Sequence, residues 1–229
     1  MARGVGRSPL APEGNGRVER PHPGRSPGGG EHKSDAPLPG SAARGCYVKI
    51  RRLLPTDWPA FRALRLEALK ADPLAFGSTR RRETAYPEHR WREWTQSGAA
   101  GDRSATFVVE TEPGRLLGMA GVFTDRGEYH VWGMWVSPEA RGRGLGRDLL
   151  DRVLAWAGST HPERPVRLDV NPVQTVAVRL YESRGFRPTG VRRPLGHDPP
   201  ALVEEMAREP AGAPVRPRRR PAVRRRGAA

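Results

Sequence analysis

The sequence predicts an α/β protein whose mixed sheet of six to seven strands carries helices on both faces. Several short segments alternate apolar and polar residues, as half-buried strands do, and others repeat apolar residues at the helical period. A strand, a glycine-rich loop, a helix and a second strand also follow one another between residues 129 and 170. That order implies a parallel crossover, whereas the short turns before it favour an antiparallel meander, so both pairings are expected in one sheet.

The two ends of the chain differ from its middle in composition. The 229 residues include 27 glycines and 24 prolines, which cluster at both ends. Residues 1–45 carry almost no large apolar side chains, and residues 209–229 are rich in Pro, Ala and Arg. Neither segment can bury enough apolar surface to offset the entropy of ordering it. We therefore expect disordered tails on either side of one folded domain, which spans residues 46–208.

The first half of the domain is expected to hold a strand, two helices and a three-stranded meander. Thr56 or Asp57 caps the first helix, and Asp72-Pro73 ends it. The expected strands are 47–53, 104–110, 116–123 and 129–136, and the second helix is 84–96. In the last of these strands, alternation would place four residues on one face: His130, Trp132, Met134 and Val136.

The second half is expected to alternate helices and strands. A helix over 145–157 buries one apolar side, and a strand over 165–170 follows it. Asn171 is the expected N-cap of the next helix, with Pro172 at its first position and Gly185 after its end. Val176, Leu180 and Tyr181 would line one side of this helix, and two strands at 186–189 and 201–207 complete the sheet.

The loop between residues 141 and 146 is the strongest functional signal. Gly142, Gly144 and Gly146 let the backbone bend and approach a ligand closely, and Arg141 and Arg143 add positive charge. The loop opens a helix whose first N–H groups have no internal partners, so they and the helix dipole favour an anion. The sequence therefore predicts a cradle for a phosphate or pyrophosphate.

Charge and cysteine content limit the partners and the cellular compartment that we expect for the protein. The net charge is +15, and seven arginines lie between Arg216 and Arg226. That tail could contact nucleic acid or another polyanion, or it could be a solvated basic tail, and we favour the second reading. Cys46 is the single cysteine, no apolar run suggests a signal or a membrane span, and the histidines form no metal-binding pattern. A cytoplasmic protein is expected.

Two segments together resemble the GNAT acetyltransferase superfamily. The first, residues 134–146, fits the family's (Arg/Gln)-x-x-Gly-x-(Gly/Ala) loop through Arg141, Gly144 and Gly146. The second, Leu168-Asp-Val-Asn through Leu180-Tyr-Glu-Ser-Arg-Gly-Phe186, fits its Asn…Ala…Tyr…Gly-Phe helix. The likeness extends over residues 47–207 by the order of elements, and it implies a GNAT fold.

The resemblance also implies acyl transfer from acetyl-CoA to an amine. The CoA pyrophosphate would lie on backbone N–H groups of a loop whose residues are Arg141, Gly142, Arg143, Gly144, Leu145 and Gly146. The pantetheine arm would lie between two splayed strands, near Trp135 and Val136, and Asn171 would hydrogen-bond it. Tyr181 matches the tyrosine that gives a proton to the departing thiolate, a role that suits a phenol as general acid.

The base and the acceptor stay open at this stage. Several family members carry a glutamate where this sequence has His130, and an imidazole with an ordinary pKa near ~6.5 can also deprotonate an amine, directly or through water. Glu128 is the rival base. The first two helices usually shape the acceptor pocket, so Phe76, Trp91 and Trp94 either contact an acceptor or belong to the core. The acceptor could be a peptide N-terminus, a lysine or a small amine.

Two other functions compete with transfer. The Gly142-x-Gly144 turn and Asp169 superficially fit a dinucleotide-binding oxidoreductase, but the glycine spacing and the late position of the loop argue against it. A non-catalytic acyl-CoA sensor, or a module that binds polyanions, is the second alternative.

Overall fold

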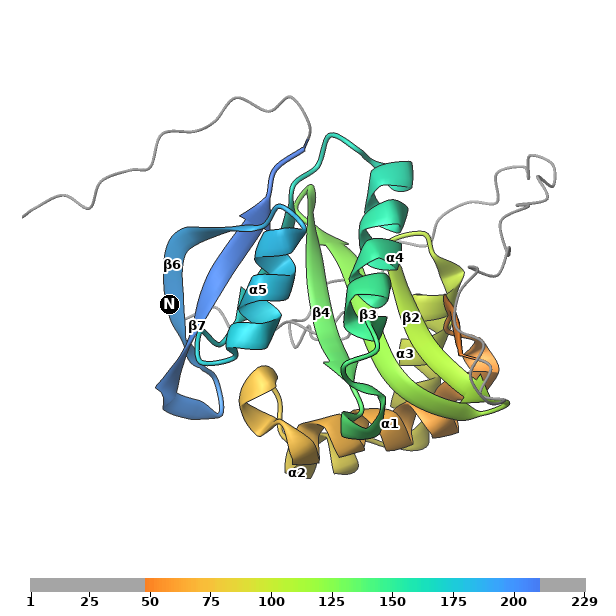
Figure 1. Cartoon of the computed structure of the whole chain (residues 1–229). Helices are drawn as coiled ribbons and strands as arrows, with labels where there is room; N and C mark the ends of the chain where they lie inside the picture. The colour runs from red at the N-terminus through yellow and green to blue at the C-terminus, as the bar shows by residue number, and fades with distance from the viewer. Residues whose placement is uncertain (1–47, 211–229) are drawn as a thin grey trace, which may run out of the picture.

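The computed structural model describes residues 48–210, which form one seven-stranded sheet with helices on both sides (Figure 1). The strands are β1 (Lys49–Arg52), β2 (Ser104–Glu112), β3 (Arg115–Asp125), β4 (Glu128–Val136), β5 (Val166–Val170), β6 (Arg187–Leu195) and β7 (Asp198–Arg208). The helices are α1 (Trp58–Ala71), α2 (Arg80–Thr84), α3 (Glu88–Ala100), α4 (Leu145–Thr160) and α5 (Thr175–Ser183). Three short 3-10 turns join them: η1 (Pro55–Asp57), η2 (Pro73–Ala75) and η3 (Pro138–Ala140).

The sheet has the mixed topology that the sequence predicts. Its strand order is β1-β2-β3-β4-β5-β7-β6, and only β4 and β5 pair in parallel. Helix α4 is the crossover between them, so the antiparallel meander and the C-terminal hairpin lie on opposite sides of the one parallel pair.

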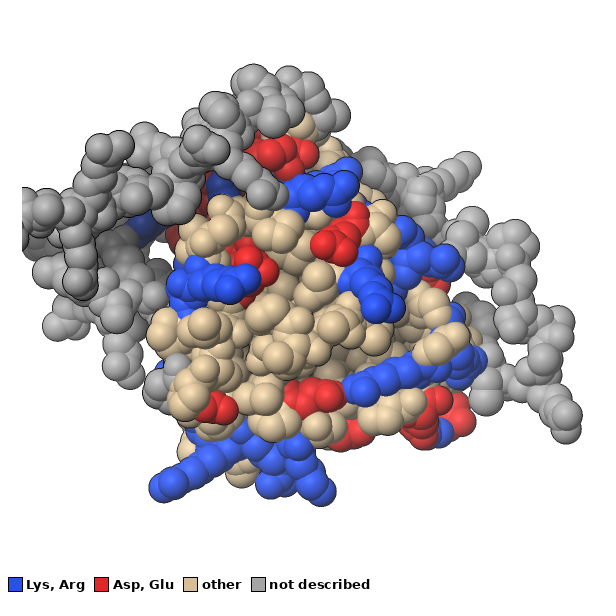
Figure 2. All heavy atoms as spheres, turned by 60° about the vertical axis from the view of Figure 1, so that its left-hand side comes forward, with Lys and Arg blue, Asp and Glu red and all other residues tan. Residues whose placement is uncertain are grey.

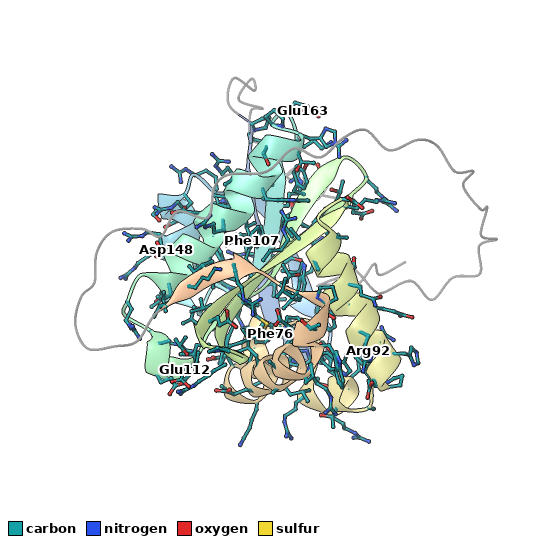
Figure 3. All side chains as sticks on the ribbon, turned by 90° about the vertical axis from the view of Figure 1, so that its right-hand side faces the viewer. Phe76, Arg92, Phe107, Glu112, Asp148 and Glu163 are labelled. Carbon is teal, nitrogen blue, oxygen red and sulfur yellow. The ribbon has the colours of Figure 1, made fainter. Side chains whose placement is uncertain are left out.

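Two separate apolar cores explain why helices are needed on both faces. One core packs α1 and α3 against the sheet through side chains such as Phe61, Trp91 and Val108. The other packs α4 and α5 against the opposite face, with Leu149 and Tyr181 among its members. In Figure 3 the helix that carries Arg92 and the helix that carries Asp148 lie on opposite sides of the sheet.

The predicted helix at 84–96 is wrong at its start. Residues 80–84 form the separate helix α2, whose N-cap Thr79 accepts the Arg82 N–H at 3.1 Å, and α3 begins at Glu88 after Pro87. The only buried side chain of α2 is Glu83, which is charged, so no apolar periodicity marks this helix. A proline disfavours helical backbone in the residue before it, which separates the two helices.

The last two strands are longer than predicted. The expected strands at 186–189 and 201–207 are parts of one long hairpin, β6 and β7. Pro188 and Pro194 argue against a strand in a sequence, but β6 is the edge of the sheet, where a missing N–H donor is tolerated.

Some expectations fall outside the described residues. Cys46, Tyr47 at the start of the first predicted strand, the N-terminal segment 1–45 and the arginines from Arg216 onward belong to this group. Among residues 48–210, no helix combines the length and the apolar character that crossing a membrane would require.

Candidate active site

Strands β4 and β5 separate soon after they meet. They pair only at Tyr129 with Val166 and at His130 with Arg167. Beyond these pairs an opening of about 510 Å³, part of it open to solvent, lies between the two strands. Its lining comes from β4 (Val131, Trp132, Gly133, Met134), β5 (Leu168, Asp169, Val170), the turn and helix after β5 (Gln174, Ala177, Leu180, Tyr181) and η2 (Ala75).

A β-bulge at Gly133 corrects the predicted alternation along β4. Met119 pairs with Trp135 and Gly121 pairs with Trp132, so β4 has one more residue than β3 in this interval. Gly133 takes a φ of +65°, which glycine adopts without strain. After the bulge the faces exchange: Trp132 packs on the core of α1 and α3, whereas Met134 and Val136 pack on the core of α4 and α5.

The glycine loop has the backbone geometry that the sequence predicts. Gly142 and Gly144 have φ values of +75° and +79°, and Gly144 is the N-cap of α4. Within residues 48–210, the N–H groups from Gly142 to Leu145 donate to no protein group. An added Cβ at Gly146 would lie 3.7 to 3.9 Å from Leu180, Met134 and Val136, so the loop borders the opening. These free donors fit an anionic group.

The side chain of Arg141 is turned to the protein. Its Nε donates to the Val136 carbonyl at 3.0 Å, and its Nη2 donates to Asp72 Oδ2 at 2.6 Å. Trp135 Nε1 donates to the same carboxylate oxygen at 2.6 Å, and its indole is buried against α1. Trp135 and Arg141 could therefore contact a ligand through their backbone, while the exposed Arg143 supplies side-chain charge beside the loop.

Among residues 48–210, Tyr181 is the one tyrosine in the lining of the opening. Its ring packs edge-on against Phe186 at 5.9 Å between centroids. Burial raises the pKa of the phenol well above 10, so the hydroxyl stays protonated at neutral pH.

Asn171 is buried, as a positioned side chain should be, but it does not cap α5. Its Oδ1 accepts the Val173 N–H at 3.1 Å in a local turn, and α5 begins only at Thr175. The carbonyl oxygen of the side chain is therefore occupied, which leaves the amide NH2 as the group that can donate. Val176 was expected to face inward but is 81% exposed, because the side of α5 that faces the opening carries Ala177, Leu180 and Tyr181 at helical spacing.

The two candidate bases differ in their surroundings. Burial lowers the pKa of His130, although Glu128, Asp125 and Asp169 act in the opposite direction, so the imidazole is neutral at pH 7. Its ring stacks on Phe123 at 5.4 Å. Glu128 Oε2 accepts a hydrogen bond from Arg167 Nε at 2.7 Å, so this carboxylate is engaged in an ion pair. His130 lies at the closed end of the opening, beside the lining residues Val131 and Trp132.

The aromatic residues predicted near the acceptor belong to the core. Phe76, Trp91 and Trp94 are at most 5% exposed and pack between α1 and α3. Ala75 and Trp132 line the opening instead, and the sequence marked neither of them as an acceptor residue. Among residues 48–210, His, Cys, Asp and Glu side chains form no group suited to a metal ion.

Two diverging strands thus enclose an opening that a glycine-rich loop borders. A model of the acetyltransferase (GNAT) family matches residues 61–186, more than half of the 229-residue chain, so the chain belongs to this family. The family consists of acetyltransferases that use acetyl-CoA as cosubstrate.

Curated relatives match part of the chain. A mycothiol acetyltransferase from Rhodococcus opacus is 38% identical over 111 residues, which is 47% of this chain and 35% of that protein. The N-alpha-acetyltransferase RimI of Mycobacterium tuberculosis is 38% identical over 91 residues, 38% of this chain and 55% of that protein. The chain thus spans less than two thirds of the length of either relative.

Solved structures share the fold over nearly their full length. A GNAT acetyltransferase from Streptococcus pneumoniae has a TM-score of 0.61 at 19% identity and covers 72% of this chain and 99% of its own. YncA from Salmonella typhimurium, solved with its cofactor acetyl-CoA, has a TM-score of 0.58 at 19% identity and covers 75% and 98%. At this level of identity the likeness concerns the fold.

Proposed function

We propose that this protein transfers an acetyl group from acetyl-CoA directly to an amine. The observation that carries the proposal is the opening between β4 and β5, which has the glycine loop at one border and the Tyr181 ring in its wall. Free N–H donors and positive-φ glycines suit a pyrophosphate, and a gap that offers both apolar side chains and polar surface suits the pantetheine arm.

The residues of the site divide the chemical work between them. Backbone N–H groups from Gly142 to Gly146 would bind the pyrophosphate, and the Asn171 NH2 would hydrogen-bond the arm. Acetyl-CoA supplies the activated thioester. His130 would take one proton from the incoming ammonium, and Tyr181 would give its proton to the departing sulfur. The nitrogen's second proton, lost after it bonds to the acyl carbon, would restore the phenol of Tyr181, which leaves an amide, free CoA and a proton on His130.

Experiment must identify the class of amine acceptor, because the names of the relatives mention different compounds. Their names mention mycothiol, N-alpha acetylation and IAA, and one solved neighbour is a spermidine N-acetyltransferase in complex with CoA and spermine. A panel should therefore include a peptide with a free N-terminus, a peptide with an internal lysine, spermidine and small primary amines.

The test combines binding and turnover. Calorimetry with acetyl-CoA and with NAD separates the transferase from an oxidoreductase, and release of free CoA thiol reports transfer to each amine. We expect binding of acetyl-CoA, no binding of NAD, and release with at least one amine. Binding without release over the whole panel would favour an acyl-CoA sensor and contradict the proposal.

A matched pair of glycine variants tests whether acetyl-CoA binds at the glycine loop. Gly144 and Gly114 have nearly equal φ values of +79° and +80°, so Gly→Ala imposes a similar backbone strain at each. Gly114 lies in the β2–β3 hairpin turn, away from the opening. Gly144→Ala should weaken acetyl-CoA binding, and Gly114→Ala should leave it unchanged.

A further inference from the structure

Asp72 occupies a position that joins three parts of the candidate site. It lies at the C-terminal end of α1, and its Oδ2 accepts hydrogen bonds from both Trp135 Nε1 and Arg141 Nη2, each at 2.6 Å. These partners are 63 and 69 residues away in the sequence. One carboxylate oxygen therefore connects α1 to the end of β4 and to the start of the glycine loop.

Arg141 extends this connection to the backbone of β4. While Nη2 is held by Asp72, Nε donates to the Val136 carbonyl at 3.0 Å, and the guanidinium lies 5.9 Å from the centre of the Trp135 ring. The arginine thus bridges the last residue of β4 and the end of α1. Its orientation fixes where the chain leaves β4 and enters the loop.

The carboxylate also determines the charge that faces a ligand. With Asp72 present, the Arg141 guanidinium has an anionic partner and points to α1. Without it, the guanidinium would lose a charge-assisted hydrogen bond and could turn toward the loop or solvent. The Asp72 side chain is 30% exposed and that of Arg141 is 48% exposed, so the ion pair adds little to global stability. Its effect should be local geometry.

We propose that Asp72 is a positioning residue that holds the acetyl-CoA loop in its binding geometry through Arg141 and Trp135. The inference rests on the proposed function, because it assigns the loop to acetyl-CoA. Asp72 also directly precedes η2, whose Ala75 lines the opening. The same carboxylate therefore ties this part of the wall to the glycine loop.

The test compares two acidic residues that both pair with an arginine. Asp72→Asn removes the negative charge at the proposed site. Glu139→Gln removes the negative charge of Glu139, which lies in η3 directly before the loop and forms an exposed ion pair with Arg115. Asp72→Asn should raise the Kd for acetyl-CoA roughly 10-fold, the scale of one hydrogen bond to a charged group, and raise KM more than it lowers kcat. Glu139→Gln should stay within about 2-fold of wild type, because an exposed ion pair contributes little.

A double-variant cycle shows whether Asp72 acts through Arg141. Arg141→Gln should weaken binding to a similar extent, and the double variant Asp72→Asn/Arg141→Gln should bind no more weakly than the worse single variant. Asp72→Glu, which keeps the charge, should recover part of the affinity. Fully additive effects, or wild-type affinity in Asp72→Asn, would overturn the proposal.

Hydrogen exchange supplies a readout that needs no ligand. In the CoA-free protein, the amides of Arg141 and Asp148 donate to the carbonyls of Pro138 and Gly144 at the two ends of the loop, and they should exchange faster in Asp72→Asn than in wild type or Glu139→Gln. Unchanged exchange in Asp72→Asn would also overturn the proposal. If wild type itself binds no acetyl-CoA while the exchange difference is present, the proposed function fails and the positioning role of Asp72 stands.

Discussion

Tyr181 carries the most specific chemical prediction of any single residue. Tyr181→Phe keeps the ring that packs on Phe186 and removes only the hydroxyl. If the phenol is the general acid, kcat should fall by about 10²- to 10⁴-fold while the Kd for acetyl-CoA stays the same. Steady-state CoA release and calorimetry measure the two quantities.

Tyr129 is the matched control for that variant. It belongs to the same core and burial raises its pKa as well, but its ring packs against Trp156 and it does not line the opening. Tyr129→Phe should keep kcat near the wild-type value. Equal losses in the two variants would mean that a buried hydroxyl in this core matters for packing and not for proton transfer.

If His130 is the base, its protonation determines how kcat/KM depends on pH. Burial lowers its pKa below the ordinary value of 6.5, so the imidazole is a free base at neutral pH and activity should decline only in more acidic solution. His130→Gln should lower kcat/KM and remove this acidic limb. Because the unfolded chain takes up the proton first, stability should also fall as the pH drops below about 6.5, and less so in the variant. A retained limb in His130→Gln and its loss in Glu128→Gln would reverse the assignment.

The residues of the site were predictable only where their role is local in sequence. The glycine loop and Tyr181 lie in short motifs, and the structure places both beside the opening. Asp72 could not be found in this way, because its partners are more than 60 residues away and nothing near it in the sequence marks them.

At the scale of elements, the bulge in β4 is the feature on which the opening depends. Gly133→Ala places a Cβ at a φ of +65°, a conformation that costs about 1 kcal/mol or more for alanine, and relief of the strain would move Trp132 or Met134. Gly127 in the β3–β4 turn has a φ of +83° and lies away from the opening, so Gly127→Ala is the control. Both variants should lose about 1 kcal/mol of unfolding free energy, but only Gly133→Ala should lose acetyl transfer. Equal activity in both would show that the bulge does not shape the site.

Helix α2 is held to α1 by a buried ion pair. Arg65 donates two hydrogen bonds of 2.9 Å to Glu83, and these residues are 5% and 1% exposed. Glu83→Gln leaves a buried guanidinium without its counter-charge and should reduce the free energy of unfolding by about 3 kcal/mol. Chemical denaturation measures this loss.

An exposed pair provides the comparison. Glu88 and Arg92 pair at one helical turn along α3 with more than half of each side chain exposed, so Glu88→Gln should change stability by less than about 0.5 kcal/mol. A small effect at Glu83 would mean that apolar contacts alone hold α2.

The buried Arg65–Glu83 pair also explains which elements the sequence could predict. Apolar periodicity correctly indicated α1, α4 and the meander, because those elements bury apolar side chains. It missed α2, which buries a carboxylate. It also made the β6–β7 hairpin too short, because the Pro- and Arg-rich edge strand β6 is held by its pairing with β7 and by ion pairs such as Arg193–Asp169.

For the whole molecule, the candidate site is a consequence of the sheet topology. The meander and the C-terminal hairpin meet at the single parallel pair, and the strands of that pair diverge after two residue pairs. Each core supports one side of the opening, with Trp132 on the core of α1 and α3 and Tyr181 on the core of α4 and α5. The order of elements in the sequence was sufficient to predict this meeting point, whereas the bulge that shapes it depends on the register between β3 and β4.

The charge of the molecule leads to the last prediction. On the face shown in Figure 2, basic and acidic side chains alternate around an uncharged centre, whereas the seven arginines between Arg216 and Arg226 have no acidic neighbours in the sequence. The elements of the site lie within residues 48–210, so removal of residues 211–229 should leave the rate of acetyl transfer within about 2-fold of that of the full chain. We also expect DNA and RNA binding to be equally weak with and without this segment. Steeply salt-dependent binding by the full chain alone would contradict that expectation and assign the arginines to a polyanionic partner.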